Sequence, residues 1–169
     1  EEDYTYTTFS NVKTYKDTLK NTTTYTYNDK GDLQSVQSSS GDITSYAYDS
    51  SGDLQSITYP NGKVENHSID YNSGTTTVTT TNPSGATSTV ITDYKGNVLE
   101  KVDGNGNHTK YGYDSKGELT TVTDAKNHIT SYGYDNAGNL QSVRNANNAL
   151  STFTYDGNNQ LLTKTDPLE

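Results

Sequence analysis

The chain has 169 residues and a formal net charge of −9, from 12 basic and 21 acidic side chains. Apolar residues make up only 28%, and Leu, Ile, Val and Phe together number 26, about 15%, which is typical of disordered chains. However, the 15 tyrosines and 29 threonines favour β-strands and are scarce in disordered segments. The composition excludes a conventional helical core and leaves a choice between disorder and an unusual all-β architecture.

The charge balance and the hydropathy exclude two classes of partner. Nucleic-acid binding relies on clustered lysine and arginine side chains, and the chain has one arginine, Arg144. No apolar run approaches the roughly 20 residues that span a bilayer. We therefore expect no nucleic-acid partner and no membrane insertion. The chain has no cysteine, so disulfides and thiolate metal sites are excluded as well.

In chain order, a 21-residue repeat accounts for most of the sequence. Residues 25–36 (YTYNDKGDLQSV) return as residues 46–57 (YAYDSSGDLQSI), and the pattern returns again from Tyr111, from Tyr132 and, more weakly, from Phe153. The residue after the second aromatic position anchors each unit, at Thr7, Asn28, Asp49, Asp70, Asp93, Asp114, Asp135 and Asp156. We therefore predict one array of about eight units over residues 1–167. Residues 168–169 could be a remnant of the expression vector.

All anchors are 21 residues apart except for one step of 23, which falls in a degenerate part of the chain. Here His67 and Ile69 replace the two aromatic residues before the anchor, and threonines fill most of residues 75–81. Because threonine is β-branched, it favours a strand and is a poor linker residue. We expect two drifted repeats in this region, with two inserted residues near Asn82 and Pro83.

Two turn signals divide each unit into two strands. The first is Asp-x-x-Gly, whose first side chain can accept the backbone N–H two residues on, while the glycine supplies a positive φ. This pattern predicts a type I turn followed by a glycine bulge. The second signal lies thirteen residues after the anchor, at Gly41, Gly62, Gly106, Asn127 and Asn148, with Gly85 shifted by the insertion. The pairs Asn61-Gly62 and Asn105-Gly106 are typical of tight hairpin turns.

The strands between these turns are predicted to form a continuous antiparallel meander of about sixteen short strands. The two aromatic residues of each unit are separated by one residue, so they point to the same face. They form one ladder of Tyr4, Tyr25, Tyr46, Tyr111, Tyr132 and Phe153, and a second ladder of Tyr6, Tyr27, Tyr48, Tyr113, Tyr134 and Tyr155. We expect each ring to pack on its neighbours along a ladder.

The returning strand leaves one question open. Its leucine, such as Leu33, is followed three residues later by a second aliphatic residue, such as Val36, which is out of phase with a simple pleat. Either a β-bulge intervenes or both faces of the sheet carry some apolar residues.

The pattern Tyr-x-Tyr-Asp-x-x-Gly-x-Leu at 21-residue spacing closely resembles the YD-repeat (Rhs) family over essentially the whole chain. That family includes bacterial polymorphic toxins, insecticidal toxin-complex subunits, wall-associated proteins and animal teneurins. The resemblance implies a hairpin array that winds as a spiralling β-sheet into a hollow shell, which in the toxins encloses a cytotoxic C-terminal domain. The positions with an expected structural role in the repeat are Tyr25, Tyr27, Gly31, Leu33, Tyr46, Tyr48, Asp49, Gly52, Leu54, Tyr111, Tyr113, Asp114, Gly117, Leu119, Tyr132, Tyr134, Asp135, Gly138, Leu140, Tyr155 and Asp156.

No residue pattern indicates catalysis, a cofactor or a metal. The chain contains no nucleophile elbow and no phosphate-loop spacing, and its paired carboxylates recur at turns where backbone capping explains them. His67 takes a ladder position, while His108 and His128 fall near second turns. Residues 103–107, with Asp114 at the twelfth position, resemble a calcium loop but lack its glycine and its flanking helices. We therefore assign no catalytic, cofactor-binding or metal-binding residue.

We expect a non-enzymatic structural β-repeat segment of a large secreted or cell-surface bacterial protein. Its partners would be the remaining repeats and a cargo or toxin domain of the parent protein, and the segment would form part of a shell or of an adhesive stalk. The alternative is a carbohydrate-binding module that uses exposed aromatic residues, of which Tyr15, Tyr59, Tyr71 and Tyr94 lie off the ladders. The terminal strands lack capping repeats, so edge-to-edge self-association is also expected.

Overall fold

The computed structural model describes residues 1–167, in which every regular element is a β-strand. The strands are β1 (Asp3–Tyr6), β2 (Val12–Lys16), β3 (Thr22–Tyr27), β4 (Leu33–Gln37), β5 (Ile43–Tyr48), β6 (Leu54–Thr58), β7 (Val64–Asn72), β8 (Thr75–Thr81), β9 (Thr87–Asp93), β10 (Val98–Val102), β11 (His108–Tyr113), β12 (Leu119–Thr123), β13 (Ile129–Tyr134), β14 (Leu140–Arg144), β15 (Leu150–Tyr155) and β16 (Leu161–Thr165). The described residues include no helix that is long and apolar enough to cross a membrane. The prediction for residues 168–169 lies outside the described residues.

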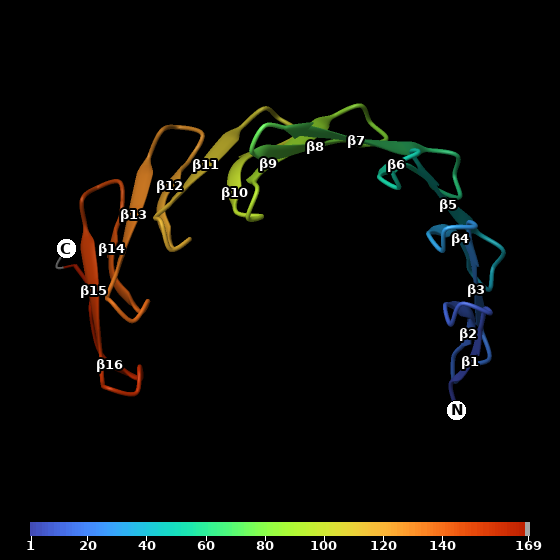
Figure 1. The fold of residues 1–169 in the computed structure, drawn as a ribbon, viewed down its shortest axis with the longest axis horizontal. Helices are drawn as coiled ribbons and strands as arrows, with labels where there is room; N and C mark the ends of the chain where they lie inside the picture. The colour runs from blue at the N-terminus through green and yellow to red at the C-terminus, as the bar shows by residue number, and fades with distance from the viewer. Residues whose placement is uncertain (168–169) are drawn as a thin grey trace. The chain divides into compact units, whose positions relative to one another are not determined.

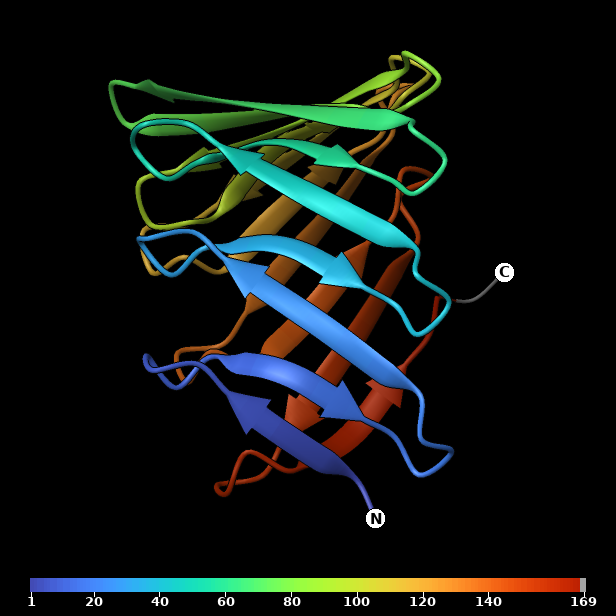
Figure 2. The same ribbon diagram turned by 90° about the vertical axis from the view of Figure 1, so that its right-hand side faces the viewer.

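The order of the strands in the sheet is their order in the chain, from β1 to β16 (Figure 1). The chain divides into two compact units, Glu1–Ile69 with Thr79–Thr87, and Asp70–Val78 with Ser88–Glu169. Within each unit, successive strands run in opposite directions and are joined at alternate ends, as Figure 2 shows for β1 to β6. The predicted all-β, antiparallel hairpin array is therefore confirmed.

A β-bulge in each regular hairpin answers the question about the returning strand. In the β3–β4 hairpin, Tyr25 pairs with Val36 and Tyr27 pairs with Leu33, and the register shifts between them so that Gln34 is an extra residue. Paired residues in adjacent strands point to the same face, so the bulge brings both aliphatic side chains to the tyrosine face. The same shift occurs in the hairpins β1–β2, β5–β6, β11–β12, β13–β14 and β15–β16.

Both turn signals give the same turn. In the first turn of the β5–β6 hairpin, the Gly52 N–H donates to the Asp49 carbonyl (3.2 Å) and the Asp49 N–H donates to the Asp53 carbonyl (2.9 Å). Gly52 has a φ of 99°, so the predicted type I turn with its glycine bulge is confirmed. The residues predicted for the second turn also have positive φ, at Gly41, Gly62, Gly85, Gly106, Asn127 and Asn148.

The pairs Asn61-Gly62 and Asn105-Gly106 lie in hairpin turns, as expected, but not in the two-residue turn that such pairs favour. Such a turn needs a positive φ at both residues, and only the two glycines have one. The Gly62 N–H donates to the carbonyl of Tyr59, three residues earlier, at 2.9 Å. Each pair therefore fills the last two positions of a four-residue turn that is the same as the others.

The degenerate region differs from the prediction in two ways. Asp70 lies inside β7 and not at a turn, because β7 continues to Asn72. The turn at 82–85 has the same hydrogen bonds as the other turns, so the two extra residues are not inserted there. Instead, the spacing changes on both sides of the positive-φ residue Gly74. The step from Gly62 to Gly74 is 12 residues, whereas the equivalent regular step from Gly41 to Gly52 is 11. The step from Gly74 to Gly85 is 11 residues, whereas the equivalent regular step from Gly52 to Gly62 is 10. One extra residue therefore lies on each side of Gly74.

No residue in the described part of the chain is buried, so each unit is a sheet one layer thick with no enclosed core. The expected packing of ring on ring along the ladders is also wrong, since the ring pairs found among residues 1–167 are Tyr4 with Tyr6 (6.5 Å) and Tyr4 with Tyr15 (4.9 Å). Each repeat contributes two strands, so equivalent tyrosines are at least about 9.6 Å apart, and the register offsets them by a further two residues along the strand, which is beyond ring contact. An aliphatic side chain of the intervening strand, such as Val36, pairs with Tyr25 on one side and with Thr44 on the other.

Candidate functional site

The tyrosines and aliphatic residues of each unit lie on one side of the sheet, here called the aromatic face. Cross-strand pairs build it, for example Tyr46 with Ile57 and Tyr48 with Leu54 in β5 and β6. Of the positions assigned to the repeat, those on this face are Tyr25, Tyr27, Leu33, Tyr46, Tyr48, Leu54, Tyr111, Tyr113, Leu119, Tyr132, Tyr134, Leu140 and Tyr155. The others, Gly31, Asp49, Gly52, Asp114, Gly117, Asp135, Gly138 and Asp156, lie in the first turns.

The second tyrosine of a unit also bonds to the neighbouring strand. The Tyr48 hydroxyl in β5 donates to the Leu33 carbonyl in β4 at 2.9 Å, just where the β4–β5 pairing stops at Ser35 with Ser45. The bulge at Gln34 interrupts the backbone ladder at this point, and the phenol supplies a donor to the carbonyl beside it. The same bond joins Tyr27 to Val12, Tyr113 to Val98 and Tyr155 to Leu140. A phenylalanine at these positions could not make it.

Carboxylates lie beside this second row of tyrosines. Partial burial and the nearby Asp32 carboxylate raise the pKa of the Tyr48 hydroxyl above its ordinary value of 10.0. In the second unit, partial burial and the Glu118 carboxylate raise the pKa of Tyr134 in the same way. Tyr46, Tyr48 and Asp32 also line a hollow of about 450 Å³ at the first turns of the first unit.

The opposite side of the sheet is here called the hydroxyl face, because short polar side chains pair across it. The hydroxyls of Thr26 and Ser35 are 2.7 Å apart, and those of Thr154 and Thr163 are 2.6 Å apart. Gly112 takes the same position in β11, where an added Cβ would lie 2.4 Å from the Thr121 hydroxyl. A side chain at Gly112 would therefore require the Thr121 hydroxyl to move.

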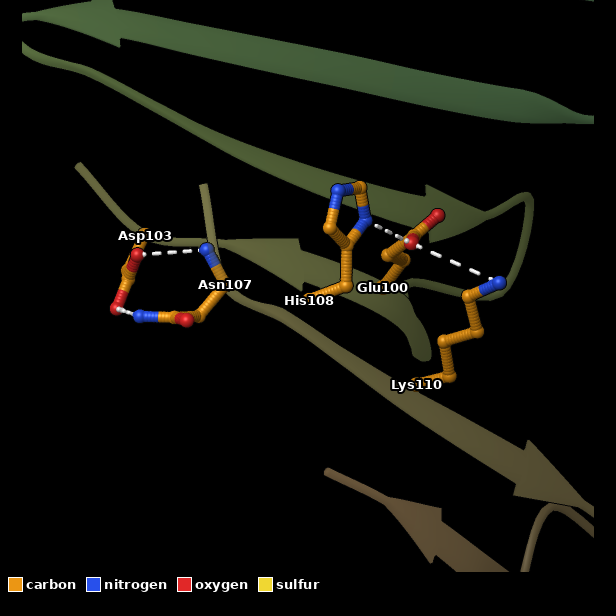
Figure 3. A network of polar contacts seen from close by, with 5 residues as sticks. All are labelled: Glu100, Asp103, Asn107, His108 and Lys110. Atoms are coloured by element: carbon orange, nitrogen blue, oxygen red, sulfur yellow. Dashed lines mark hydrogen bonds and ion pairs between the residues drawn. The ribbon is translucent and has the colours of Figure 1, made fainter. Parts of the chain in front are cut away.

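A polar network on the hydroxyl face of the second unit is the most concentrated group of charges (Figure 3). Oε1 of Glu100 in β10 lies 2.7 Å from Nδ1 of His108 and 4.0 Å from Nζ of Lys110, and both of these residues are in β11. The His108 and Lys110 side chains are more than half exposed. The network places one carboxylate beside an imidazole and an ammonium group and leaves no shielded nucleophile or base.

Where a turn begins with aspartate or asparagine, that side chain closes the turn. Oδ1 of Asp103 accepts the N–H groups of Asn105 and Asn107, and its Oδ2 accepts the side-chain amide of Asn107, all at 2.9 Å. Figure 3 shows the two bonds to Asn107. These bonds, the amide of Asn107 first, lower the pKa of Asp103 below 3.8. The bond to the residue two positions on is the predicted one. The bond four positions on and the partner amide were not predicted.

The histidines and the calcium-like stretch do not form a metal site. Within residues 1–167, no group of three or more His, Asp or Glu side chains is placed to hold a metal ion. The Asp103 oxygens already bond to their own turn, while Asp114 starts the turn at the far end of β11. His108 pairs with Glu100, and His128 pairs with Asp124 at 2.9 Å.

The tyrosines off the ladders do not gather into one site. Tyr15 lies on the aromatic face against Tyr4, with ring centroids 4.9 Å apart. Tyr59 donates to Glu65 at 3.4 Å, and Tyr94 is 79% exposed in a turn. Their positions alone do not define a ligand-binding arrangement.

These features define a repeat protein whose single-layer sheet is held together by capped turns, bulges and tyrosine hydroxyls. The family model for the teneurin YD-shell matches residues 1–129, and the model for the RHS repeat matches residues 113–150 and 134–168. The chain belongs to this family of YD-shell and RHS-repeat proteins, which confirms the resemblance seen in the sequence.

Solved structures of toxin complexes share the fold. The Tc holotoxin pore of Photorhabdus luminescens, with a TccC3 mutation, matches with a TM-score of 0.56 and 14% identity, over 96% of this chain and 11% of that chain. A crystal structure of TcdB2-TccC3 matches with a TM-score of 0.55, 14% identity and the same coverage of 96% and 11%. The chain thus spans about a tenth of the length of these structures. No curated protein matches it.

Proposed function

We propose that this chain is a structural, non-enzymatic segment of the wall of a YD-repeat shell, and that the shell belongs to a larger secreted or surface-displayed bacterial protein and encloses a polypeptide. The observation that carries the proposal is a single-layer sheet with no buried residue among those described, in a chain of the YD-shell family. Such a sheet encloses nothing by itself and separates two spaces, which is what a wall does.

The terminal strands support a role within a longer array. Within residues 1–167, β1 pairs with β2 alone and β16 pairs with β15 alone, so each of these strands has one edge that is open to a further strand. In the parent protein these edges would pair with the adjacent repeats. In the isolated chain they would pair with other copies, so sedimentation should show an apparent mass that rises with concentration.

The wall function is tested on the full-length parent protein by limited proteolysis. If the repeats enclose a polypeptide, that polypeptide should resist protease in the intact parent and be cut rapidly once mild denaturant opens the shell. Equal cutting rates before and after opening would refute the proposal. A matched control is the enclosed polypeptide expressed alone, which should be cut at the rapid rate throughout.

The carbohydrate-binding alternative stays a prediction of the tyrosine pattern. Binding of the chain to a glycan panel, with loss on replacing ladder tyrosines, would favour an adhesive module over a wall. No binding at millimolar sugar concentration is the outcome expected for a wall segment.

A further inference from the structure

The aromatic face presents rings that nothing else in the chain covers. No described residue is buried, and although Tyr4 and Tyr6 on the edge strand are the most open, at 48% and 59% exposed, the ladder tyrosines of the inner strands are partly exposed as well. A face of partly exposed rings in a single-layer sheet is a surface available to a partner. Its chemistry must therefore be deduced from the groups that already lie on it and around it.

A cation already lies on this face within the second unit. Lys101 in β10 takes the position that Val36 holds in β4, since Lys101 pairs with Thr109 as Val36 pairs with Thr44. Its Nζ lies 5.9 Å from the centroid of the Tyr111 ring, within the range of a cation–π interaction. This contact shows that an ammonium group can be accommodated over a ladder tyrosine.

Carboxylates surround the rings in each unit separately. In the first unit, Asp32 and Asp49 line the hollow of about 450 Å³ together with Tyr46 and Tyr48. Lys30 also lines this hollow, but its Nζ donates to the backbone carbonyl of Ser50 at 2.9 Å.

In the second unit, Asp93 lies close enough to Tyr113, and Glu118 close enough to Tyr134, to act on these hydroxyls electrostatically. The whole chain carries a net charge of −9. The rings are therefore bordered by negative charge in a protein that is itself acidic, so a cationic partner complements the face both locally and overall.

We propose that the aromatic face binds an extended cationic polypeptide segment, with lysine or arginine side chains over the ladder tyrosines and their charges towards the carboxylates of the first turns. This inference rests on the proposed function, in which the wall faces an enclosed polypeptide, and it specifies the chemistry of that polypeptide. A sugar ring could stack on the same tyrosines, but a neutral sugar would have no electrostatic attraction to the neighbouring carboxylates.

The geometry of the repeat suggests a suitable probe. Successive repeats are about 9.6 Å apart across the sheet, since each repeat contributes two strands at about 4.8 Å spacing, and equivalent tyrosines are offset by a further two residues along the strand, because Val36 pairs with Thr44 and not with Tyr46. A polyproline II segment repeats every three residues, or about 9.3 Å. The probe is therefore a labelled peptide of about 15 residues that repeats arginine-proline-proline, and the control peptide has glutamate in place of arginine.

The binding test uses fluorescence anisotropy with the full 169-residue chain at low and physiological salt. The arginine peptide should bind and weaken with salt, whereas the glutamate peptide should not bind. No binding of the arginine peptide at low salt, or equal binding of the two peptides, overturns the proposal.

Two matched pairs of variants separate the aromatic face from general charge attraction. Tyr46→Leu combined with Tyr132→Leu should weaken binding about fivefold, whereas Tyr94→Leu, which removes an exposed turn ring, should leave it unchanged. Asp32→Asn should weaken binding more than Asp42→Asn, which removes the same charge at the opposite end of β5. Equal effects within either pair contradict the proposal.

A measurement on the unmodified chain gives a result that does not depend on whether the variants fold. In NMR spectra, the ring resonances of ladder tyrosines should shift on adding the arginine peptide, while threonine methyl groups of the hydroxyl face, such as Thr26, should not. Shifts confined to the hydroxyl face would place the peptide on the wrong side and overturn the inference. Protease protection in the parent protein is measured independently of peptide binding, so failure here leaves the wall function standing, whereas loss of protection with peptide binding intact would count against the wall function alone.

Discussion

Within the first unit, the regular β5–β6 hairpin and the drifted β7 and β8 segments solve the same packing problem differently. Tyr46 pairs with Ile57 in the regular hairpin. At the equivalent place, Nδ1 of His67 in β7 lies 3.3 Å from the hydroxyl of Thr80 in β8. The drifted segments therefore have a pair of polar side chains where the regular hairpin has an aromatic and an aliphatic one, and a hydrogen bond takes the place of the apolar contact.

The polar version brings a carboxylate with it. Glu65 in β7 lies on the same face, and its Oε1 is 2.9 Å from Nε2 of His67, although Nε2 makes no hydrogen bond among the described residues. Oε2 of Glu65 accepts the Tyr59 hydroxyl at 3.4 Å. The two regions share a positive-φ glycine, Gly52 or Gly74, and differ in their side-chain pairs and in the length of the turn, since β7 ends at Asn72 and β8 begins at Thr75. The positive-φ glycine is therefore the element common to both, and the face is the variable part.

The largest effect should come from breaking the shared element. Replacing Gly52 or Gly74 by valine places a β-branched residue at a φ of 99° or 86°, and we expect each change to cost about 1–2 kcal/mol in the free energy of unfolding. Urea unfolding measures it. The control is Asn159→Gly, which gives glycine to a turn whose φ is already 61° and should be neutral or stabilising. Unchanged midpoints for both valine variants would show that the stability of these turns does not depend on the shared glycine.

The next effect isolates the tyrosine hydroxyl. Tyr48→Phe removes the donor to the Leu33 carbonyl and should cost about 1 kcal/mol, because the carbonyl beside the bulge loses its partner. Tyr46→Phe is the matched control on the same strand and should cost much less. Thermal unfolding of the two variants gives the comparison, and equal losses would mean that the rings alone matter.

A smaller effect should follow from converting the drifted pair into the regular one. The double variant His67→Tyr with Thr80→Ile rebuilds the apolar pair, and we expect a gain of about 0.5–1 kcal/mol. Each single variant should lose stability, since it leaves a polar group opposite an apolar one. A double-mutant cycle measures the coupling between the two positions. A coupling near zero would contradict the idea that the two residues changed as a pair.

The mildest test is the dependence of stability on pH. The carboxyl groups of Asp103, Asp114 and Asp135 have a pKa below 3.8 in the folded chain. Their contribution to the free energy of unfolding is therefore complete above pH 3.8, and it is lost as the pH falls through the lowered pKa. The hydroxyls of Tyr48 and Tyr134 have a folded pKa above 10.0, so their contribution is present below pH 10.0 and is lost as the pH rises through the raised pKa.

Melting temperatures from pH 2 to 11 should therefore show a plateau with a fall at each end. In Asp103→Asn the acid fall should be shallower, because the amide oxygen still accepts the turn N–H groups and does not titrate. An acid fall of the same size in this variant and in the unmodified chain would contradict the role given to the turn carboxylates.

Local features of the fold could be predicted because they depend on residue types at fixed spacings. The positive φ at Gly52 and Asn127 follows from the side chains that tolerate it. The positive φ at Ser10 and Lys20 could not be predicted, since neither residue type signals it. In the last complete turn, Asn159 and not Gly157 has the positive φ. The position of a residue in the turn therefore determines which residue has a positive φ, even where a glycine is nearby.

Features that depend on neighbouring strands were beyond the sequence. The spacing of Leu33 and Val36 required a bulge or a two-sided sheet, and only the register distinguishes them. The bond from Tyr48 to the Leu33 carbonyl depends on where that bulge exposes a backbone acceptor. The stacking of tyrosines was wrongly predicted because the sequence spacing of 21 residues hides the strand that lies between two equivalent rings.

Amide hydrogen exchange on the 169-residue chain tests most directly whether capped hairpins can stay ordered without a buried interior. We expect slow exchange in the paired strands and fast exchange at the turn tips, in a pattern that repeats every 21 residues over the regular repeats. Uniformly fast exchange, or protection concentrated in one segment as for an enclosed core, would contradict this explanation of the fold.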